Sequence, residues 1–322
     1  MLKKLTTLCK NLSWKNSIKV SVIITTYNSQ QTIERLLNSI YKQKGINEHF
    51  NIEVIIVDDC SKDNTVQVIR ENFPEALFFI NDSNSGGPNK GRNIGLNIAS
   101  GEYICIADHD DEWIEDKILR QLECVSLAPA PIISSGYNLY EKQQLKEIRT
   151  NKQSQKEILF FEQNVTFLKI LSKNKNRQSV YIGSLMFHKS LKNILFEEKY
   201  GQLDFDWLLR LFENNASVEI NLPLYNRYFD GDNLSINEKY RNNDYKYGLV
   251  VLNKYSEKYP HESKLGIKRL NGTYARYFYM VGDMKKARHY FLRSQFSLKM
   301  ILYVLTSFVG HKWVKKHFHI FG

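Results

Sequence analysis

The sequence predicts an α/β protein, with a mostly parallel central sheet flanked by helices and a helical C-terminal extension. Two observations predict the sheet. Short apolar, β-prone runs occur from residue 19 onward, and they alternate four times with segments whose apolar residues recur at helical spacing. Such alternation is typical of parallel strands joined by right-handed crossovers. A third observation predicts the extension: from about residue 226 the pattern changes to Tyr-rich helices without strands.

The elements of the first half follow from these patterns in order. Residues 19–26 are apolar and β-branched, and they predict a buried first strand. Apolar residues at helical spacing from Ile33 to Tyr41 predict the next helix, and Gly45 suits its end. By the same criteria, the later elements of this half are strands at 53–57, 77–80 and 103–107 and helices through 66–73, 94–98 and 118–125.

The second half of the sheet is less regular in sequence. Residues 140–178 are polar and rich in Lys, Gln and Asn, so we predict loops and short helices there. A strand at 180–187, a helix beginning within 203–212 and a strand at 217–222 follow. We place a domain boundary after residue 225, which gives one domain over 1–225 and a helical extension over 226–322.

Charge and composition narrow the class of partner. The 322 residues include 45 Lys and Arg against 34 Asp and Glu, and this net charge of +11 favours phosphorylated small molecules, a lipid surface or nucleic acid. The four cysteines lack metal-ligand or redox spacing, so we expect free thiols in a reducing compartment. Residues 1–16 lack the apolar core of a secretory signal, and no stretch has the length of a membrane span. We therefore expect a cytoplasmic protein.

Carboxylates follow two of the predicted strands. Asp108 and Asp110 end the strand at 103–107, and Asp58 and Asp59 end the strand at 53–57. Because open α/β sheets bind ligands outside the carboxyl ends of their strands, both pairs should line one crevice. Clustered like charges are costly without compensation, so a divalent cation is the natural partner. The alternatives are a solvated acidic turn after one strand and helix caps or turn formers after the other.

Two further features suit a nucleotide. Tyr27 follows the first strand and could stack on a base, while an Asp bonds the ribose and a metal bridges the phosphates. Residues 86–93 place three glycines, Lys90 and Arg92 before a helix, whose N-terminus favours anions. The spacing matches neither a P-loop nor a dinucleotide fingerprint, and an ordinary Gly-rich loop is the alternative.

Four blocks of the sequence together resemble those of glycosyltransferase family 2, in order and in spacing. They are residues 22–28, 56–65, 86–95 and 101–111, and a fifth block at 203–211 resembles the family's catalytic-base block. The resemblance implies the GT-A fold and an inverting, metal-dependent enzyme that uses a nucleotide sugar. It covers residues 18–125 and the base block, and it does not extend beyond residue 230.

The resemblance also implies roles for individual residues. Thr25, Tyr27 and Asp59 would hold the nucleobase and the ribose. Asp108 would lie at the ribose side of the metal-binding signature, and Asp110 would ligate Mn or Mg.

Arg92 and Asp204 are further implied site residues. Arg92 would support the donor site, or it would only order the carboxylates; Gly91 stands beside it where Ala is usual. Asp204 would be the catalytic base, although the Glu that commonly precedes this position is absent. Asp206 is the rival for that role.

The implied reaction moves a hexose or N-acetylhexosamine from a nucleoside-diphosphate sugar, most commonly a UDP-sugar. The acceptor would be a hydroxyl of a glycan or glycolipid, as in bacterial surface polysaccharide or lipopolysaccharide assembly. Processive members of the family carry a Gln-x-x-Arg-Trp motif and membrane spans, and neither follows Asp206. We therefore expect single additions. The segment with Arg227 and Ser235 often closes over the donor in similar enzymes, and a solvated loop is the alternative.

Two other functions compete with glycosyl transfer. A sugar-phosphate nucleotidyltransferase would carry a Gly-rich, basic loop directly after the first strand, where this chain has Tyr27, Asn28 and Ser29. A nucleic-acid-binding protein would suit the net charge. The acidic strand ends argue against such a groove, so we expect no nucleic-acid partner.

The C-terminal tail suits a membrane surface. Residues 285–322 hold eight Lys or Arg and no acidic residue, and apolar side chains recur there at helical spacing. An amphipathic, basic segment of this kind fits an anionic bilayer, which would place the protein on the inner face of the cytoplasmic membrane. The alternative is a helix that packs on the catalytic domain.

Overall fold

The computed structural model describes residues 18–127, 130–174, 180–200, 203–229 and 238–310. The chain forms two compact units, one of residues 1–167 and 176–231 and the other of residues 168–175 and 232–322. The boundary expected after residue 225 falls inside the last strand of the first unit, β10, which runs from Ser217 to Phe229.

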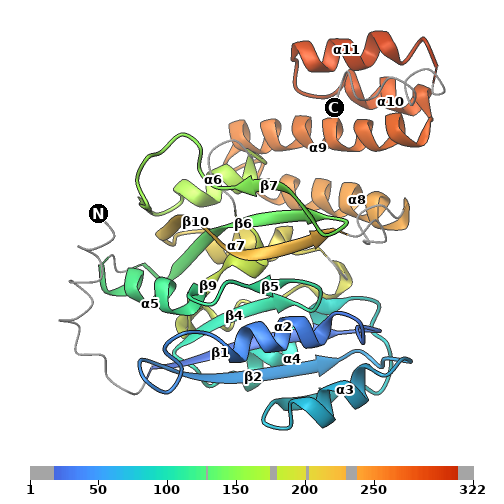
Figure 1. The fold of residues 1–322 in the computed structure, drawn as a ribbon. Coiled ribbons are helices and arrows are strands. Elements are labelled where there is room, and N and C mark those ends of the chain that lie inside the picture. The colour runs from blue at the N-terminus through green and yellow to red at the C-terminus, as the bar shows by residue number, and fades with distance from the viewer. Residues whose placement is uncertain (1–17, 128–129, 175–179, 201–202, 230–237, 311–322) are drawn as a thin grey trace. The chain divides into compact units, whose positions relative to one another are not determined.

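The first unit is built on one ten-stranded sheet with the order β3-β2-β1-β4-β9-β6-β10-β5, where β7 also pairs with β6 and β8 with β10 (Figure 1). Strands β1 to β4 are parallel, as predicted. The strands of this half are β1 (Lys19–Thr26), β2 (Asn51–Asp58), β3 (Leu77–Ile80) and β4 (Tyr103–Asp108). The helices are α2 (Ile33–Tyr41), α3 (Thr65–Asn72), α4 (Pro88–Ile98) and α5 (Lys117–Leu127).

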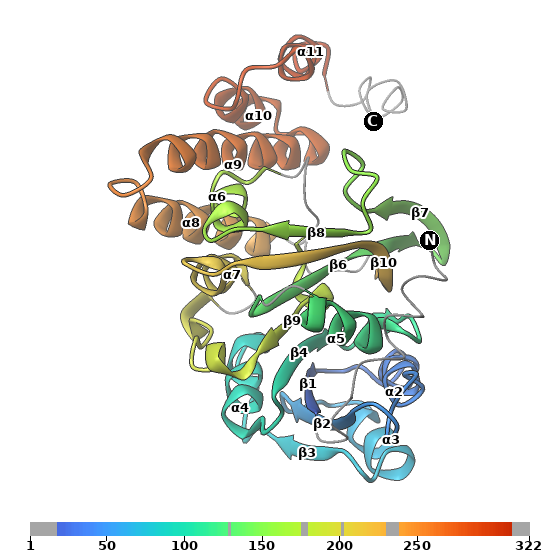
Figure 2. The ribbon, with the colours of Figure 1, turned by 90° about the vertical axis from the view of Figure 1, so that its left-hand side faces the viewer.

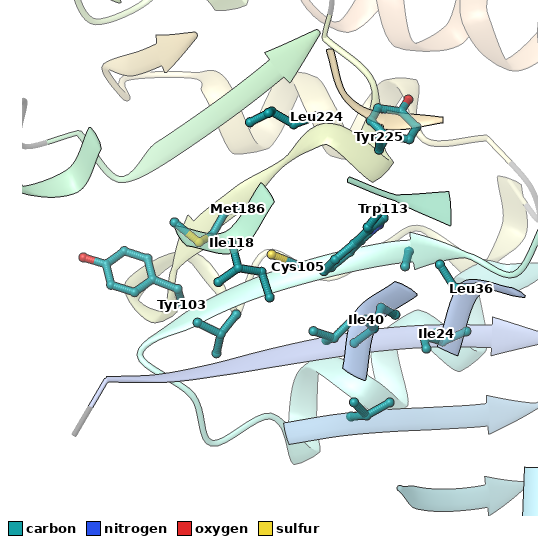
Figure 3. Packing of buried hydrophobic residues seen from close by; sticks show 14 of the residues in the cluster. Ile24, Leu36, Ile40, Tyr103, Cys105, Trp113, Ile118, Met186, Leu224 and Tyr225 are labelled. Carbon is teal, nitrogen blue, oxygen red and sulfur yellow. The ribbon is translucent and has the colours of Figure 1, made fainter. Parts of the chain in front are cut away.

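Side chains of β1 alternate between the two faces of the sheet, and different helices pack on each face. Val22 and Ile24 join the core that α2, α3 and α5 cover. Ile23 points to the other face, where α4 lies so close that a Cβ on Gly95 would come 2.3 Å from Ile23 Cγ2. Figure 3 shows the first core, with Ile24, Leu36 and Ile40 beside Trp113. The two layers hold the carboxyl ends of β1, β2 and β4 side by side.

The second half of the sheet contains strands that the sequence pattern did not predict. Its elements are β5 (Glu112–Trp113), β6 (Ile132–Glu141), β7 (Gln144–Arg149), β8 (Ile158–Phe161), α6 (Val165–Leu171), β9 (Met186–His188), α7 (Phe205–Phe212) and β10. The prediction of only loops and short helices at 140–178 was wrong. β7 pairs with β6, and β8 pairs with β10. Neither strand alternates between buried apolar and exposed polar residues: four of the six residues of β7 are exposed, and the four residues of β8 are all apolar.

The strand predicted at 180–187 is also mostly absent. A 3₁₀ turn occupies Ile182–Ser184, and only Met186–His188 pair as a strand. The turn is fixed locally, since the Ser184 hydroxyl donates to the Tyr181 carbonyl at 2.6 Å. β10 instead runs seven residues past the predicted end at 222, to Phe229.

The second unit is helical in its described part. Its elements are α8 (Glu238–Lys254), α9 (Pro260–Val281), α10 (Met284–Phe291) and α11 (Leu298–Thr306). α9 ends at Gly282, which adopts a left-handed φ of 96°. Consecutive helices contact each other, and α9, α10 and α11 share a small core that includes Tyr279, Phe291 and Tyr303 (Figure 2). None of the described helices combines the length and the apolar character that a membrane crossing requires.

Candidate active site

The register of the sheet brings the predicted site residues to one edge. Thr25 of β1 lies opposite Asp108 of β4, and Thr26 lies opposite Asp58 of β2. The expectation that the acidic strand ends are neighbours is therefore met by β2 and β4, which lie on either side of β1. Tyr27 follows directly after β1, and its side chain is 44% exposed.

Asp58 is a turn former. It is fully buried, and its Oδ1 accepts hydrogen bonds from the hydroxyls of Thr26 at 2.8 Å and Ser61 at 2.6 Å. Its Oδ2 accepts from the Ser61 amide at 2.8 Å. These bonds stabilise the turn after β2, in which Cys60 has a left-handed φ of 67°.

Asp59 ties this turn to the loop before α4. Its Oδ1 accepts from Asn81 Nδ2 at 2.8 Å, and its Oδ2 accepts from the Ser85 amide at 2.9 Å. The Asn84 side chain donates to the Asp59 carbonyl at 3.1 Å. Asp59 thus holds the Gly-rich loop beside the ends of β1 and β2.

Asp108 lies between two donors. Arg92 Nη2 approaches its Oδ1 at 2.9 Å, and the Tyr181 hydroxyl donates to its Oδ2 at 2.7 Å. Burial raises the pKa of Asp108, but Arg92 and Tyr181 outweigh burial and hold that pKa below its ordinary value. Asp108 is therefore an anion with a fixed orientation. Sequence reasoning missed Tyr181, because nothing in a segment predicted as a strand pointed to its hydroxyl.

The carboxylate of Asp110 is differently placed. Arg35 of α2 donates to the Asp110 carbonyl and stacks over the Tyr228 ring, 3.8 Å from its centroid. Within the described residues, no other residue donates a hydrogen bond to the Asp110 carboxylate. Burial raises its pKa, with the charge of Asp108 adding to the effect and His109 opposing it. A bound cation would favour the charged form of the Asp110 carboxylate, and a metal ligand must be in that form.

Asp111, the next residue in the chain, is buried. Its Oδ2 is buried without a hydrogen-bond partner, and burial together with the charges of Asp110 and Asp108 raises its pKa well above the ordinary value. The nearby Tyr225 hydroxyl is also buried and unpartnered. The raised pKa favours the neutral form of Asp111, in which the repulsion among the three acids is smaller.

Arg227 of β10 connects the acidic groups. Its guanidinium lies 4.2 Å from the centroid of the Tyr181 ring, and its charge lowers the pKa of all four acids of the site. These acids are Asp108, Asp110, Asp111 and Asp204. Burial lowers the pKa of Arg227, but Tyr181, Tyr225 and Asp111 outweigh burial, so the group stays charged. Ser235, the other residue expected in this segment, lies outside the described residues.

Asp204 immediately precedes α7 and faces the same cluster. Burial raises its pKa, Arg92 lowers it, and the charge of Asp108 raises it further. Its side chain makes no capping bond to α7, although it occupies the N-cap position. Asp206, the rival base, is 2% exposed, and its Oδ2 accepts from Arg210 Nε at 2.8 Å on the same helix.

The block around Arg92 supports the segment that carries Asp204. Asn93 Nδ2 donates to the Phe196 carbonyl at 3.0 Å, and Asn93 Oδ1 accepts from the Phe196 amide at 2.7 Å. Asn89 Nδ2 donates to the carbonyls of Glu197 at 3.2 Å and Leu203 at 3.4 Å. These bonds from Asn89 and Asn93 order the segment before α7. Gly91 is needed there, because a Cβ would lie 2.8 Å from Thr25 Cγ2.

The donor set fits a metal ion that is completed by its substrate. No group of three or more His, Cys, Asp or Glu side chains with metal-binding geometry occurs in the described part of the chain. Mg²⁺ usually binds one or two carboxylates together with substrate phosphates. The available carboxylate of Asp110 matches this mode.

Comparison with known proteins decides the family. The sequence model of glycosyl transferase family 2 matches residues 21–191, more than half of the chain. The chain belongs to glycosyltransferase family 2. It is 43% identical over 105 residues to a poly(ribitol-phosphate) β-N-acetylglucosaminyltransferase, TarS, of Staphylococcus aureus, a match that covers 32% of this chain and 18% of TarS.

For two other relatives, the match covers a larger share of the relative's own length. The putative teichuronic acid biosynthesis glycosyltransferase TuaG of Bacillus subtilis is 34% identical over 122 residues, which cover 37% of this chain and 47% of TuaG. The GalNAc(5)-diNAcBac-PP-undecaprenol β-1,3-glucosyltransferase of Campylobacter jejuni is 36% identical over 99 residues, which cover 30% of this chain and 31% of that enzyme. The matches thus span less than half the length of these relatives.

The solved structures confirm the GT-A-like fold. The crystal structure of S. aureus TarS 1–349 in complex with UDP-GlcNAc superposes with a TM-score of 0.65 at 19% identity, covering 89% of this chain and 82% of that one. The same fragment in complex with UDP superposes with a TM-score of 0.61 at 18% identity, covering 86% and 79%.

Proposed function

We propose that this family 2 member is an inverting, metal-dependent and non-processive glycosyltransferase that moves a sugar from a UDP-sugar to a hydroxyl of a glycan or lipid-linked acceptor. The observation that carries the proposal is the position of Asp204. Its partly buried carboxyl is close enough to Arg92, Asp108 and Arg227 for their charges to shift its pKa, although Asp204 lies about a hundred residues after Asp108 in the chain. One pocket can therefore offer both a donor site and a base.

The donor site would use the ends of β1 and β2. The exposed ring of Tyr27 is available to stack on a base. Thr25 and Asp59 would bind the base and the ribose, and the Asp59 amide donates to the carbonyl of Thr26, which lies between Thr25 and Tyr27 in the chain, at 2.8 Å. UDP is supported because TarS has been solved with UDP and with UDP-GlcNAc. Asp108, fixed by Arg92 and Tyr181, would lie on the ribose side.

The diphosphate would be bound by Asp110 and Arg227. Asp110 would hold Mn or Mg, and such an ion supplies charge neutralisation for the departing diphosphate. Within the described residues the Arg227 guanidinium donates no hydrogen bond, so its N–H groups remain available for phosphate oxygens. A charged, partly buried donor stabilises the negative charge that develops on a leaving group.

Asp204 would act as the base. An acceptor hydroxyl would lose its proton to the Asp204 carboxylate as its oxygen attacks the anomeric carbon and the bond to the diphosphate breaks. Attack opposite the leaving group inverts the anomeric configuration. The raised pKa makes Asp204 a stronger base than a solvated carboxylate, and it requires a pH above that pKa for activity.

We place the reaction in surface glycan assembly at the inner face of the cytoplasmic membrane. The relatives support this, since one is named for teichuronic acid biosynthesis and another for an undecaprenol-linked product. A sugar-phosphate nucleotidyltransferase is disfavoured by the turn after β1. There the Asn28 amide donates to Ser61 Oγ and Asn28 Oδ1 accepts from the Lys62 amide, without the Gly-rich basic loop that such an enzyme requires.

Two variants at the start of α7, one at its N-cap Asp204 and one at Asp206, test the base directly. Asp204→Asn should lower turnover about 10²–10⁴-fold while the thermal shift induced by a UDP-sugar with Mn²⁺ stays nearly unchanged. The matched Asp206→Asn variant should keep turnover, provided that its thermal midpoint confirms folding. Retained transfer by Asp204→Asn would remove the base from this position, and loss only in Asp206→Asn would move it there.

A further inference from the structure

The outward side of α11 is an apolar surface. Leu298, Leu302 and Leu305 are 50–80% exposed and lie on one side of the helix, and Val309, in the turn after it, is 56% exposed. Phe296 and Phe308 flank this stripe and are more than 70% exposed. We call these six residues the α11 surface.

The opposite side of α11 is fixed within the second unit. Tyr303 is buried against Tyr279 and Phe291, and the hydroxyls of Tyr279 and Thr306 are 2.6 Å apart. Arg288 of α10 donates to the Ser307 carbonyl at 3.0 Å. The helix therefore cannot rotate to bury its exposed stripe without losing this packing.

The charged residues of α10, α11 and the segment between them have one sign. Residues 284–310 include five Lys or Arg and no Asp or Glu. Arg293 and Lys299, which flank Phe296 and Leu298 in sequence, have exposed side chains. A cluster of exposed apolar side chains with only basic charges complements an anionic bilayer, where the apolar groups enter the acyl boundary and the bases meet headgroups.

The length of α11 sets its orientation. Nine helical residues rise about 14 Å, roughly half of the hydrocarbon thickness of a bilayer. We propose that the α11 surface docks on an anionic membrane, with α11 lying in the plane of the headgroups. This inference stands on the second unit alone and does not depend on the reaction proposed for the first.

Vesicle co-sedimentation of the full chain tests the proposal. Vesicles of phosphatidylcholine with phosphatidylglycerol should bind the protein, and vesicles of phosphatidylcholine alone should bind it at least tenfold less. Leu302→Ser with Leu305→Ser should lower partitioning about tenfold or more. Arg293→Gln with Lys299→Gln should lower it about 25-fold on the anionic vesicles.

Matched variants on the first unit provide the controls. Leu145→Ser with Phe160→Ser removes equally exposed apolar groups, and Lys142→Gln with Lys152→Gln removes the same charge from another exposed site. Both pairs should leave partitioning within about twofold. Thermal midpoints confirm that every variant is folded.

Two results would overturn the proposal. One is equal vesicle binding by the chain with and without Leu302→Ser and Leu305→Ser. The other is that the chain binds neither kind of vesicle and forms a dimer in sedimentation velocity, and that these two substitutions dissociate the dimer. The α11 surface would then be an interface between two copies of the chain. Turnover with a water-soluble acceptor should be unchanged in these variants, which separates this test from that of the base.

Discussion

Charge pairing decides the chemistry of individual residues at this site. Asp108, the last residue of β4, is an oriented anion because Arg92 and Tyr181 each hold one of its oxygens. Asp110, two residues away, lacks such donors within the described chain, and its pKa is raised by burial. Neighbouring carboxylates of one turn therefore suit different roles, one in positioning and one in binding a cation.

Removal of the Tyr181 hydroxyl tests the orientation of Asp108. Tyr181→Phe takes away the 2.7 Å bond to Oδ2 and should cost about 1.5–3 kcal/mol of unfolding free energy. The Michaelis constant for the donor should also rise. Tyr225→Phe is the control, since it removes a buried hydroxyl without a partner and should be neutral or stabilising. Chemical denaturation of both variants measures the difference, and equal destabilisation would contradict this role of Tyr181.

Substitution of Arg227 should change both rate and pH dependence. Arg227→Gln should lower kcat/KM about 10²-fold, because a charged donor near the diphosphate is lost. The charge of Arg227 also lowers the pKa of Asp204, so its removal raises that pKa and moves the acidic limb of the rate profile to higher pH. A profile of kcat against pH measures the shift. A limb that stays in place or moves to lower pH would show that Arg227 and Asp204 are not neighbours.

At the scale of elements, the carboxyl and amino ends of the parallel strands have different roles. The carboxyl ends of β1, β2 and β4 carry the site, and the amino ends carry a polar network that joins the same strands. Glu53 of β2 accepts from Ser21 of β1 at 2.6 Å and from the Ser100 amide at 3.0 Å, and Lys19 pairs with it at 3.0 Å.

This network predicts a pH-dependent contribution to stability. Burial raises the pKa of Glu53, but the bonds from Ser100, Ser21 and Lys19 outweigh burial and lower it to about 2 from an ordinary 4.5. A depressed pKa stabilises the fold above the ordinary value, and the gain is lost as pH falls toward the lower one. Glu53→Gln should therefore lower the thermal midpoint at neutral pH, with the difference from the parent chain shrinking between pH 4.5 and about 2. A difference that is constant across this range would contradict the assignment.

Prediction from sequence succeeded where a pattern is local. The alternation from residue 19 onward gave β1 to β4 and their helices, and the acids at the strand ends were placed together because parallel strands end at one edge. It failed at β7 and β8, whose pairing partners are distant in sequence and whose side chains are partly exposed. Tyr181 could not be found either, because its role depends on a 3₁₀ turn and on a contact with a residue 73 positions away.

At the scale of the whole molecule, the two units divide the properties of the chain. The first belongs by sequence to glycosyltransferase family 2 and places four acids, one of them buried, near one guanidinium. The second presents an apolar, basic surface on α11. Residues 232–322 hold 17 Lys or Arg against six Asp or Glu, so this part of the chain carries an excess equal to the whole net charge of +11.

The convergence of three strand ends on one nucleotide pocket is the central claim, and a crystal structure of the chain with UDP and Mn²⁺ tests it most directly. We predict that the uracil lies on Tyr27, that the ion binds Asp110 and the diphosphate, and that the Asp204 carboxylate faces the terminal phosphate from the acceptor side. A nucleotide bound away from Tyr27 and Asp110, or an Asp204 side chain turned out of that pocket, would contradict the claim.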